Sequence, residues 1–183
     1  ISRDGTYIAA PIKRTQQLPT LNSDTENSQL MFFSKDSGTP WWTSSIDAYG
    51  SRINCDISDD GRYVLLGTGE KGGAANYGDS NKLILYDTQS ATPSTPIWKS
   101  SQYASDIIGV SIRGDADYFV ASITDDGIDV YDFVDKSANP SVVFNNSTGG
   151  DWFGSDVDWV NQGRYGQSSS GDTQQVGPVK ITK

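Results

Sequence analysis

The sequence predicts an all-β fold built from stacked, four-stranded antiparallel sheets, and three observations carry this prediction. The first is a phrase of seven residues that occurs four times in the 183-residue chain, at 1–7, 57–63, 112–118 and 159–165. The second is the regular spacing of these copies, whose first residues lie 56, 55 and 47 positions apart. The third is the pattern between the copies, where short β-rich runs alternate with polar turns and no helical periodicity occurs. A fixed period of about 50 residues is typical of repeat architectures.

The phrase predicts a tight turn between two strands. Its copies read I-S-R-D-G-T-Y, I-S-D-D-G-R-Y, I-R-G-D-A-D-Y and W-V-N-Q-G-R-Y. Glycine at the fifth position suits a backbone with positive φ, which glycine adopts without strain. Ala116 stands at this position in the third copy, and we therefore expect a turn of a different type there. The tyrosine that closes each copy is expected to pack between neighbouring sheets.

Each repeat unit is predicted to contain four short strands. The first leads into the phrase, at 52–57 and 107–112. The second follows the phrase, at 7–10, 63–66 and 118–121. The third is an apolar or alternating run, at 29–33, 82–86, 128–131 and 178–181. The fourth is a short aromatic strand, at 41–43, 97–99 and 142–144.

A β-propeller, in which four-stranded sheets stack around a common axis, lets such short strands bury both faces of each sheet. A two-sheet sandwich is the alternative, but it gives no reason for one phrase to recur at this spacing. We expect units at about 1–45, 46–100, 101–147 and 148–183, with the first and last incomplete. About four units would close only a small ring, so we expect the chain to be part of a larger or multi-chain propeller.

The run I-S-D-D-G-R-Y-V-L-L-G-T, followed by N-K-L-I-L-Y-D and P-I-W-K-S, resembles the WD-repeat and quinoprotein-like β-propellers of archaeal and bacterial cell-surface proteins. In those repeats an S-x-D-G-x-Y stretch leads to a strand that ends in Y-D or F-S, and a Trp follows. The resemblance extends over nearly the whole chain. It implies a propeller fold, and it implies a scaffold, adhesin or sensor more often than an enzyme.

A second, local resemblance is to the Asp-box of sialidases, S-x-D-x-G-x-T-W. The stretch S-K-D-S-G-T-P-W supplies Ser34, Asp36, Gly38 and Trp41, with Pro40 in place of the usual Thr. The resemblance implies a structural turn between a third and a fourth strand. In that turn, the Asp accepts backbone N–H bonds and the Trp packs between strands. No catalytic role is implied.

The composition argues against several classes of function. The 14 Lys and Arg residues and 23 Asp and Glu residues give a net charge of −9, which repels the phosphates of nucleic acids. The chain has no His, which removes the commonest general base and zinc ligand. Cys55 lies in an alternating strand pattern, which favours a small buried side chain over a reactive thiol. We expect no catalytic residue, no bound cofactor and no membrane-spanning segment.

Two kinds of site stay open. Asp125, Asp126 and Asp151 are candidate ligands for Ca²⁺, for which the alternative role is turn formation. Asn145 and Asn146 begin two overlapping N-x-S/T sequons and are candidate glycosylation sites. Together with the acidity of the chain, the sequons favour an extracellular or cell-surface setting.

The polar stretches 11–28 and 70–80 both follow the strand after the phrase, and we expect them to emerge on one face of the ring. These loops, together with open strand edges, are predicted to bind a protein partner or a second copy of the chain. The first functional hypothesis is a non-enzymatic interaction or structural scaffold. The alternative is a carbohydrate-active or quinoprotein-type propeller enzyme whose catalytic residues lie mainly outside this segment.

Overall fold

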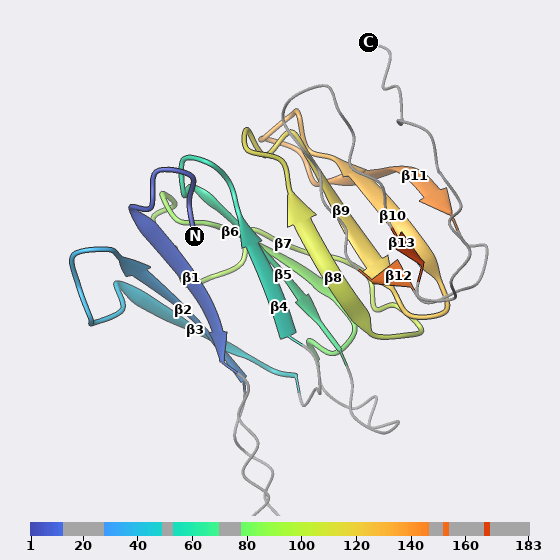
Figure 1. Cartoon of the computed structure of the whole chain (residues 1–183), viewed down its shortest axis with the longest axis horizontal. Helices are drawn as coiled ribbons and strands as arrows, with labels where there is room; N and C mark the ends of the chain where they lie inside the picture. Colours follow the sequence, from blue (N-terminus) through green and yellow to red (C-terminus); the bar gives the residue numbers. More distant parts are fainter. Residues whose placement is uncertain (13–27, 49–52, 70–77, 147–151, 154–166, 169–183) are drawn as a thin grey trace, which may run out of the picture.

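The computed structural model describes residues 1–12, 28–48, 53–69, 78–146, 152–153 and 167–168. Within these residues every regular element is a β-strand (Figure 1). The strands are β1 (Tyr7–Ile12), β2 (Ser28–Ser34), β3 (Trp42–Ile46), β4 (Ile53–Ile57), β5 (Tyr63–Thr68), β6 (Leu83–Asp87), β7 (Trp98–Lys99), β8 (Ile107–Ile112), β9 (Tyr118–Ile123), β10 (Gly127–Asp132), β11 (Ser141–Asn146), β12 (Trp152–Phe153) and β13 (Gln167–Ser168).

These strands form antiparallel sheets that follow one another along the chain. The first sheet has the order β1-β2-β3, the second β4-β5-β6-β7 and the third β11-β10-β9-β8, and β12 pairs with β13. The three larger sheets lie side by side like the blades of a propeller (Figure 1). The strands predicted up to residue 144 are present, and the run at 178–181 lies outside the described residues. β3 continues to Ile46, past the boundary expected at 45, and the unit boundaries stay a prediction.

The repeated phrase forms the same turn in three successive units. Gly5, Gly61 and Ala116 all have positive φ, at 71°, 73° and 58°. In each turn this residue donates its backbone N–H to the carbonyl oxygen three residues earlier, over 2.9, 2.9 and 2.7 Å. The different turn expected at Ala116 was therefore wrong. Ala116 is completely buried and belongs to the core between the second and third sheets, so tertiary packing holds alanine in the left-handed conformation.

Backbone hydrogen bonds connect the turn of one unit to the turn of the next. Arg3 donates its N–H to the carbonyl oxygen of Asp59 over 3.2 Å, and Asp59 donates its N–H to the carbonyl oxygen of Gly114 over 2.9 Å. These three residues occupy the same place in successive copies of the phrase. We call this series the turn ladder. It ties the three sheets together at the end of the molecule that carries the phrase.

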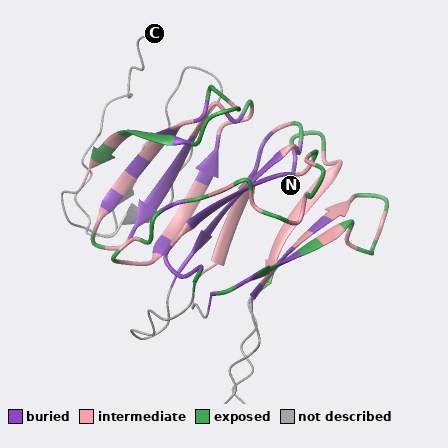
Figure 2. Ribbon diagram, turned by 180° about the vertical axis from the view of Figure 1, so that it is seen from behind, coloured by how far each residue is buried: buried purple, intermediate pink, exposed green. Residues whose placement is uncertain are grey.

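The core lies between the sheets because β5 and β6 of the second sheet bury both faces. Side chains alternate along β5, so Val64 and Leu66 pack toward the first sheet whereas Leu65 packs toward the third. β6 alternates in the same way. Figure 2 shows the resulting buried strands in the interior of the molecule.

Two of the phrase tyrosines, Tyr7 and Tyr63, pack between neighbouring units, as predicted. A Cβ atom placed on Gly61 would lie 2.2 Å from Cδ2 of Tyr7, so the Tyr7 ring fills the space beside the next turn. Tyr63 belongs to the same buried cluster as Ala116 of the following turn. The fourth copy of the phrase, with Tyr165, lies outside the described residues.

A second aromatic contact also repeats. Trp42 at the start of β3 stacks on Tyr86 of the second sheet, with ring centroids 5.6 Å apart. Trp98 of β7 packs edge-on against Tyr131 of the third sheet at 5.5 Å. In both cases the Trp opens the last strand of one sheet, and the Tyr precedes an Asp at the end of the next sheet's third strand. The Y-D and Trp features of the sequence pattern thus form part of the contact between units.

Candidate functional site

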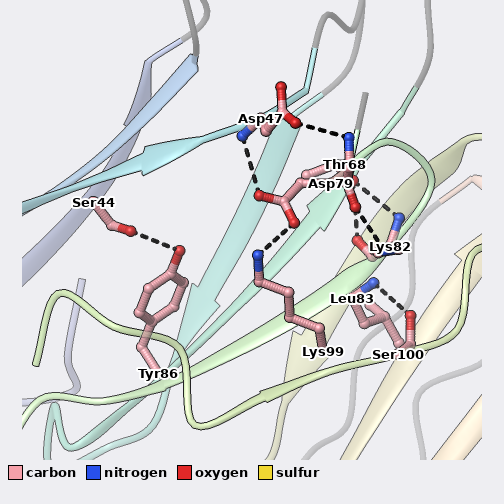
Figure 3. Close-up of polar contacts among 10 residues, drawn as sticks. Ser44, Asp47, Thr68, Asp79, Lys82, Leu83, Tyr86, Lys99 and Ser100 are labelled. Carbon is pink, nitrogen blue, oxygen red and sulfur yellow. Dashed lines mark hydrogen bonds and ion pairs between the residues drawn. The ribbon is translucent and has the colours of Figure 1, made fainter. Parts of the chain in front are cut away.

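The candidate site lies where residues 13–27 and 70–77 join the sheets. β1 and β5 end there, and β2 begins there. We call it the loop end, and it is opposite to the phrase turns. At this end, a polar network connects Asp47, Thr68, Asp79, Lys82 and Lys99 (Figure 3). We call this group the loop-end network.

Asp79 is the centre of the loop-end network. Its carboxylate accepts the backbone N–H of Asp47 over 3.1 Å and the ammonium of Lys99 over 2.5 Å. The side chain of Asp79 is 8% exposed and that of Lys99 is 41% exposed. Asp79 also donates its backbone N–H to the carbonyl oxygen of Asp47 over 2.8 Å. The buried charge is therefore satisfied by an ion pair and by a neighbouring sheet, as a buried carboxylate requires.

The same network fixes the chain on either side of residues 70–77. Asp47 Oδ2 accepts the backbone N–H of Gly78 over 2.9 Å. Thr68, the last residue of β5, donates its hydroxyl to the carbonyl oxygen of Asp79 over 2.5 Å and accepts the N–H of Lys82 over 3.0 Å. Lys82 donates its ammonium to the carbonyl oxygen of Gly78 over 2.6 Å. Thr68 and the residues from Gly78 to Lys82, on either side of residues 70–77, are thus held by one another and by Asp47, which directly follows β3 of the first sheet.

A buried tyrosine of β6, Tyr86, links the second sheet to the first. The Tyr86 hydroxyl lies 3.1 Å from Oγ of Ser44 on β3 (Figure 3). Burial raises the pKa of Tyr86 to about 12, and the hydrogen bond with Ser44 acts in the opposite direction. Tyr86 is therefore neutral at physiological pH and serves as a packing and hydrogen-bonding residue.

A second buried carboxylate, Asp129 on β10, bonds to the segment between β7 and β8 and to β11. It accepts the hydroxyl of Tyr103 over 2.8 Å and the side-chain amide of Asn145 over 2.5 Å. The hydroxyls of Tyr103 and Tyr131 also share a hydrogen bond. Burial raises the pKa of Tyr103 and of Tyr131, with the hydrogen bond between them adding to the effect at Tyr103. Asp129, Tyr103, Tyr131 and Asn145 thus form one hydrogen-bonded cluster.

The Asp-box-like turn lies between β2 and β3, where the sequence predicted it. Ser37, not Asp36, accepts the backbone N–H of Thr39, over 3.1 Å. The side chain of Asp36 is 78% exposed and lies 3.6 Å from Lys35, so the backbone-acceptor role implied for Asp36 was wrong. Trp41 is 60% exposed, but its ring packs against Tyr7 of β1 and Phe32 of β2, with centroids 5.5 and 6.3 Å apart. The packing between strands implied for Trp41 is therefore present, and Trp42 also packs against the core.

Ser34 and Gly38 hold ordinary positions in this turn. The carbonyl oxygen of Ser34 accepts the N–H of Ser37 over 3.1 Å. A Cβ atom at Gly38 would meet nothing within 4 Å. The stretch therefore forms a structural turn, as the resemblance implies.

The predicted Ca²⁺ ligands are not brought together within the described residues. No three Asp, Glu, Cys or His side chains lie close enough there to hold a metal. Asp125 has a φ of 61° in the turn between β9 and β10, which fits its alternative role in turn formation. Asp126 lies in the same turn, and Asp151 lies outside the described residues. Calcium binding stays a prediction.

The predicted glycosylation sites lie at the end of β11. Asn145 is exposed as a residue, but its side-chain amide is bonded to the buried Asp129. Asn146 is half-buried, and the Ser and Thr of both sequons lie outside the described residues. Glycosylation also stays a prediction.

Cys55 on β4 packs against the core between the first and second sheets. Its Sγ lies 3.6 Å from the carbonyl oxygen of Ala9. Burial raises the pKa of the thiol to about 12, and the neighbouring Asp56 adds to this. The thiolate that nucleophilic chemistry needs is thus disfavoured, in agreement with the predicted packing role.

The loop-end network was missed by the sequence analysis. Asp79 lies inside the stretch 70–80, which was interpreted as a polar insertion, and Lys99 follows 20 residues later. A weak signal was present, because Asp79 and Lys82 bracket a turn directly before an apolar strand.

The described part of the chain contains no apolar helix of membrane-spanning length.

Known structures share this fold at low sequence identity. The β-propeller domain of Myceliophteria thermophila Cps50 (Swd1) matches with a TM-score of 0.51 and 14% identity, over 78% of this chain and 37% of that chain. The Dos1 propeller matches with a TM-score of 0.53 and 15% identity, over 79% and 31%. A structure of KlAtg21 with the coiled coil of AgAtg16 matches with a TM-score of 0.54 and 13% identity, over 72% and 41%.

The chain thus spans less than half the length of each of these matches. No protein-family model matches it, and no curated protein matches it in sequence. The matches confirm the predicted all-β propeller fold and its correspondence to part of a larger propeller. The prokaryotic cell-surface part of the resemblance is not supported by them.

Proposed function

We propose that this chain is a non-enzymatic protein-interaction scaffold whose partner binds at the loop end of the propeller. The observation that carries the proposal is the loop-end network, in which buried Asp79 binds both Lys99 and the backbone of Asp47. The network fixes Thr68 and the residues from Gly78 to Lys82, which flank residues 70–77. Loops held on a rigid base are the usual binding elements of a scaffold.

The electrostatics and chemistry of the chain support a binding role over catalysis. The chain has no His, and the pKa of the Cys55 thiol is raised to about 12. The carboxylate oxygens of the buried Asp79 and Asp129 accept hydrogen bonds from other residues of the same chain. The KlAtg21 structure, which shares the fold, contains a coiled coil as the bound partner, and this favours a protein as ligand of the present chain.

Self-association is the second partner class that the sequence predicts. β1 is an edge strand of the first sheet, and edge strands carry backbone groups that can pair with another chain. Light scattering during size-exclusion chromatography distinguishes self-association from binding of a different protein. A concentration-dependent doubling of the mass supports self-association. The extracellular setting predicted from acidity and sequons stays a prediction.

Affinity capture with matched variants tests the scaffold proposal. One variant replaces residues 70–77 by a Gly-Ser segment of equal length. The control replaces residues 35–40, which lie in the turn at the opposite end of the sheets. We expect a protein partner that binds the unaltered chain and the control in a saturable manner. The 70–77 replacement should lose this binding while its melting temperature stays unchanged. Loss with the control alone, or turnover of sugar substrates by the chain, would overturn the proposal.

A further inference from the structure

The ammonium group of Lys136 is enclosed by three oxygen acceptors in the third unit. It donates to the carbonyl oxygens of Ala116 and Phe133 over 2.8 and 2.6 Å, and to Asp117 Oδ1 over 3.0 Å. An ammonium has three N–H donors and no acceptor, so every donor is used. We call these acceptors, together with the rings described next, the ammonium cage.

Two aromatic rings complete the ammonium cage. The nitrogen of Lys136 lies 4.5 Å from the ring centroid of Phe133 and 5.6 Å from that of Tyr63. The two rings meet edge to face, with centroids 5.4 Å apart, and both residues are almost completely buried. Both distances are within the range at which a cation is attracted to an aromatic face. The walls therefore combine hydrogen-bond acceptors with π faces around one small cation.

The cage is absent from the corresponding places of the other two described units. Phe133, Thr88 and Lys35 hold equivalent positions, because each donates its N–H to the residue that precedes the phrase tyrosine. In the second unit, the carbonyl oxygen of Gly61 accepts the hydroxyl of Thr88 instead of an ammonium. The turn ladder and the tyrosine contacts recur from unit to unit, but this cage does not. A feature that the repeat does not require is a candidate for a specific role.

The cage also differs from the neighbouring ion pair on the same tyrosine. The guanidinium of Arg62 lies 4.9 Å from the Tyr63 ring centroid and is paired with Asp87. That pair is exposed on the Arg62 side, with 40% of the side chain accessible, whereas the side chain of Lys136 is 28% exposed. The Arg62 guanidinium bonds to a single carboxylate, that of Asp87, through Nε and Nη2, whereas the Lys136 ammonium is directed to three acceptors on three different residues.

We propose that the cage is a binding site for a primary alkylammonium group, filled in this chain by its own Lys136. The ligand class is the end of a lysine side chain, and a lysine presented by a partner competes with Lys136 for the same acceptors. A quaternary ammonium lacks N–H donors and is not a ligand. A guanidinium is planar and cannot direct three donors to these converging oxygens. The proposal does not depend on the scaffold function at the loop end.

The test removes the resident ligand and adds it back as a small molecule. Lys136→Ala deletes three carbon atoms and the nitrogen, and n-propylammonium supplies three carbon atoms and an ammonium nitrogen. We expect n-propylammonium chloride to raise the melting temperature of Lys136→Ala in a saturable manner by a few degrees, since a ligand that binds only the folded state stabilises it. The unaltered chain, titrated in parallel, should shift by less than about one degree because its site is filled.

Tetramethylammonium chloride at the same ionic strength is the control ligand. Equal stabilisation of Lys136→Ala by both salts would overturn the proposal, as would no stabilisation by either. If Lys136→Ala does not fold, Lys136→Arg and Lys136→Met decide. The proposal requires both variants to lower the melting temperature by similar amounts. An arginine variant as stable as the unaltered chain would overturn the proposal, because the site would then require only a positive charge.

Discussion

At the scale of single residues, the turn positions with positive φ show that tertiary packing can hold a non-glycine residue where the sequence rule expects glycine. Gly5 and Gly61 obey the preference of the left-handed region for glycine, and Ala116 does not. An L-residue in this region costs about 1–2 kcal/mol. The methyl group of Ala116 is buried beside Tyr63 in the core, which returns about 0.8 kcal/mol. The tertiary contact, invisible in the phrase itself, made the sequence-based prediction fail.

Gly61 and Gly5 form a matched pair for substitution. Both have φ near 70°, but a Cβ atom at Gly61 would lie 2.2 Å from the Tyr7 ring, and one at Gly5 would meet nothing within 4 Å. Gly61→Ala should lower the free energy of unfolding by about 2–4 kcal/mol through strain and overpacking. Gly5→Ala should cost only about 1 kcal/mol. Urea unfolding measures both, and equal losses would contradict the packing of Tyr7 on the second turn.

Cys55 gives a prediction that depends on pH. Its pKa is raised from 9.0 to about 12, so the neutral thiol dominates at pH 8. The thiolate fraction then falls by about a thousandfold relative to an unperturbed thiol, and alkylation slows accordingly. Mass spectrometry after iodoacetamide treatment should show slow labelling of the folded protein and fast labelling in urea. Rapid labelling of the folded protein at pH 8 would contradict the burial of this thiol.

At the scale of elements, the strands were predictable because their side chains alternate between two packed faces. Val64, Leu65 and Leu66 show this pattern on β5. The pairing of elements at the loop end was not predictable. The ion pair of Asp79 and Lys99 joins a turn to β7 across 20 residues, and no local pattern encodes such a contact.

Replacing Lys99 tests the importance of this junction. Lys99→Met keeps most of the side-chain volume but leaves the buried Asp79 carboxylate without its cation. Loss of a buried partner costs about 3–5 kcal/mol, and the partial exposure of Lys99 reduces the expected loss to about 1–3 kcal/mol. Lys35→Met is the control, since Lys35 and Asp36 form a well-exposed pair worth about 0–1 kcal/mol. Denaturant unfolding should separate the two variants, and equal small losses would argue against the anchoring role of Asp79.

At the scale of the whole molecule, the repeat predicted a propeller and the comparisons confirm it. The spacing of the phrase was sufficient because the first and second copies each contact the next copy in space, through the turn ladder and through Tyr7 and Tyr63. Function was less predictable, since a propeller hosts many activities. The loop-end network depends on the pairing of Asp79 with Lys99, and the ammonium cage has no counterpart in the second unit, where the Thr88 hydroxyl bonds to Gly61. The periodic signal could therefore not reveal either of them.

Hydrogen exchange at one amide tests the stacking of units most directly. The N–H of Asp59 lies in a surface turn and is bonded to the carbonyl oxygen of Gly114 in the next unit over 2.9 Å. If the units stack through the turn ladder, this amide should exchange about a hundredfold or more slowly than in an unstructured peptide. Exchange at the peptide rate, while the amides of β5 stay protected, would contradict the account.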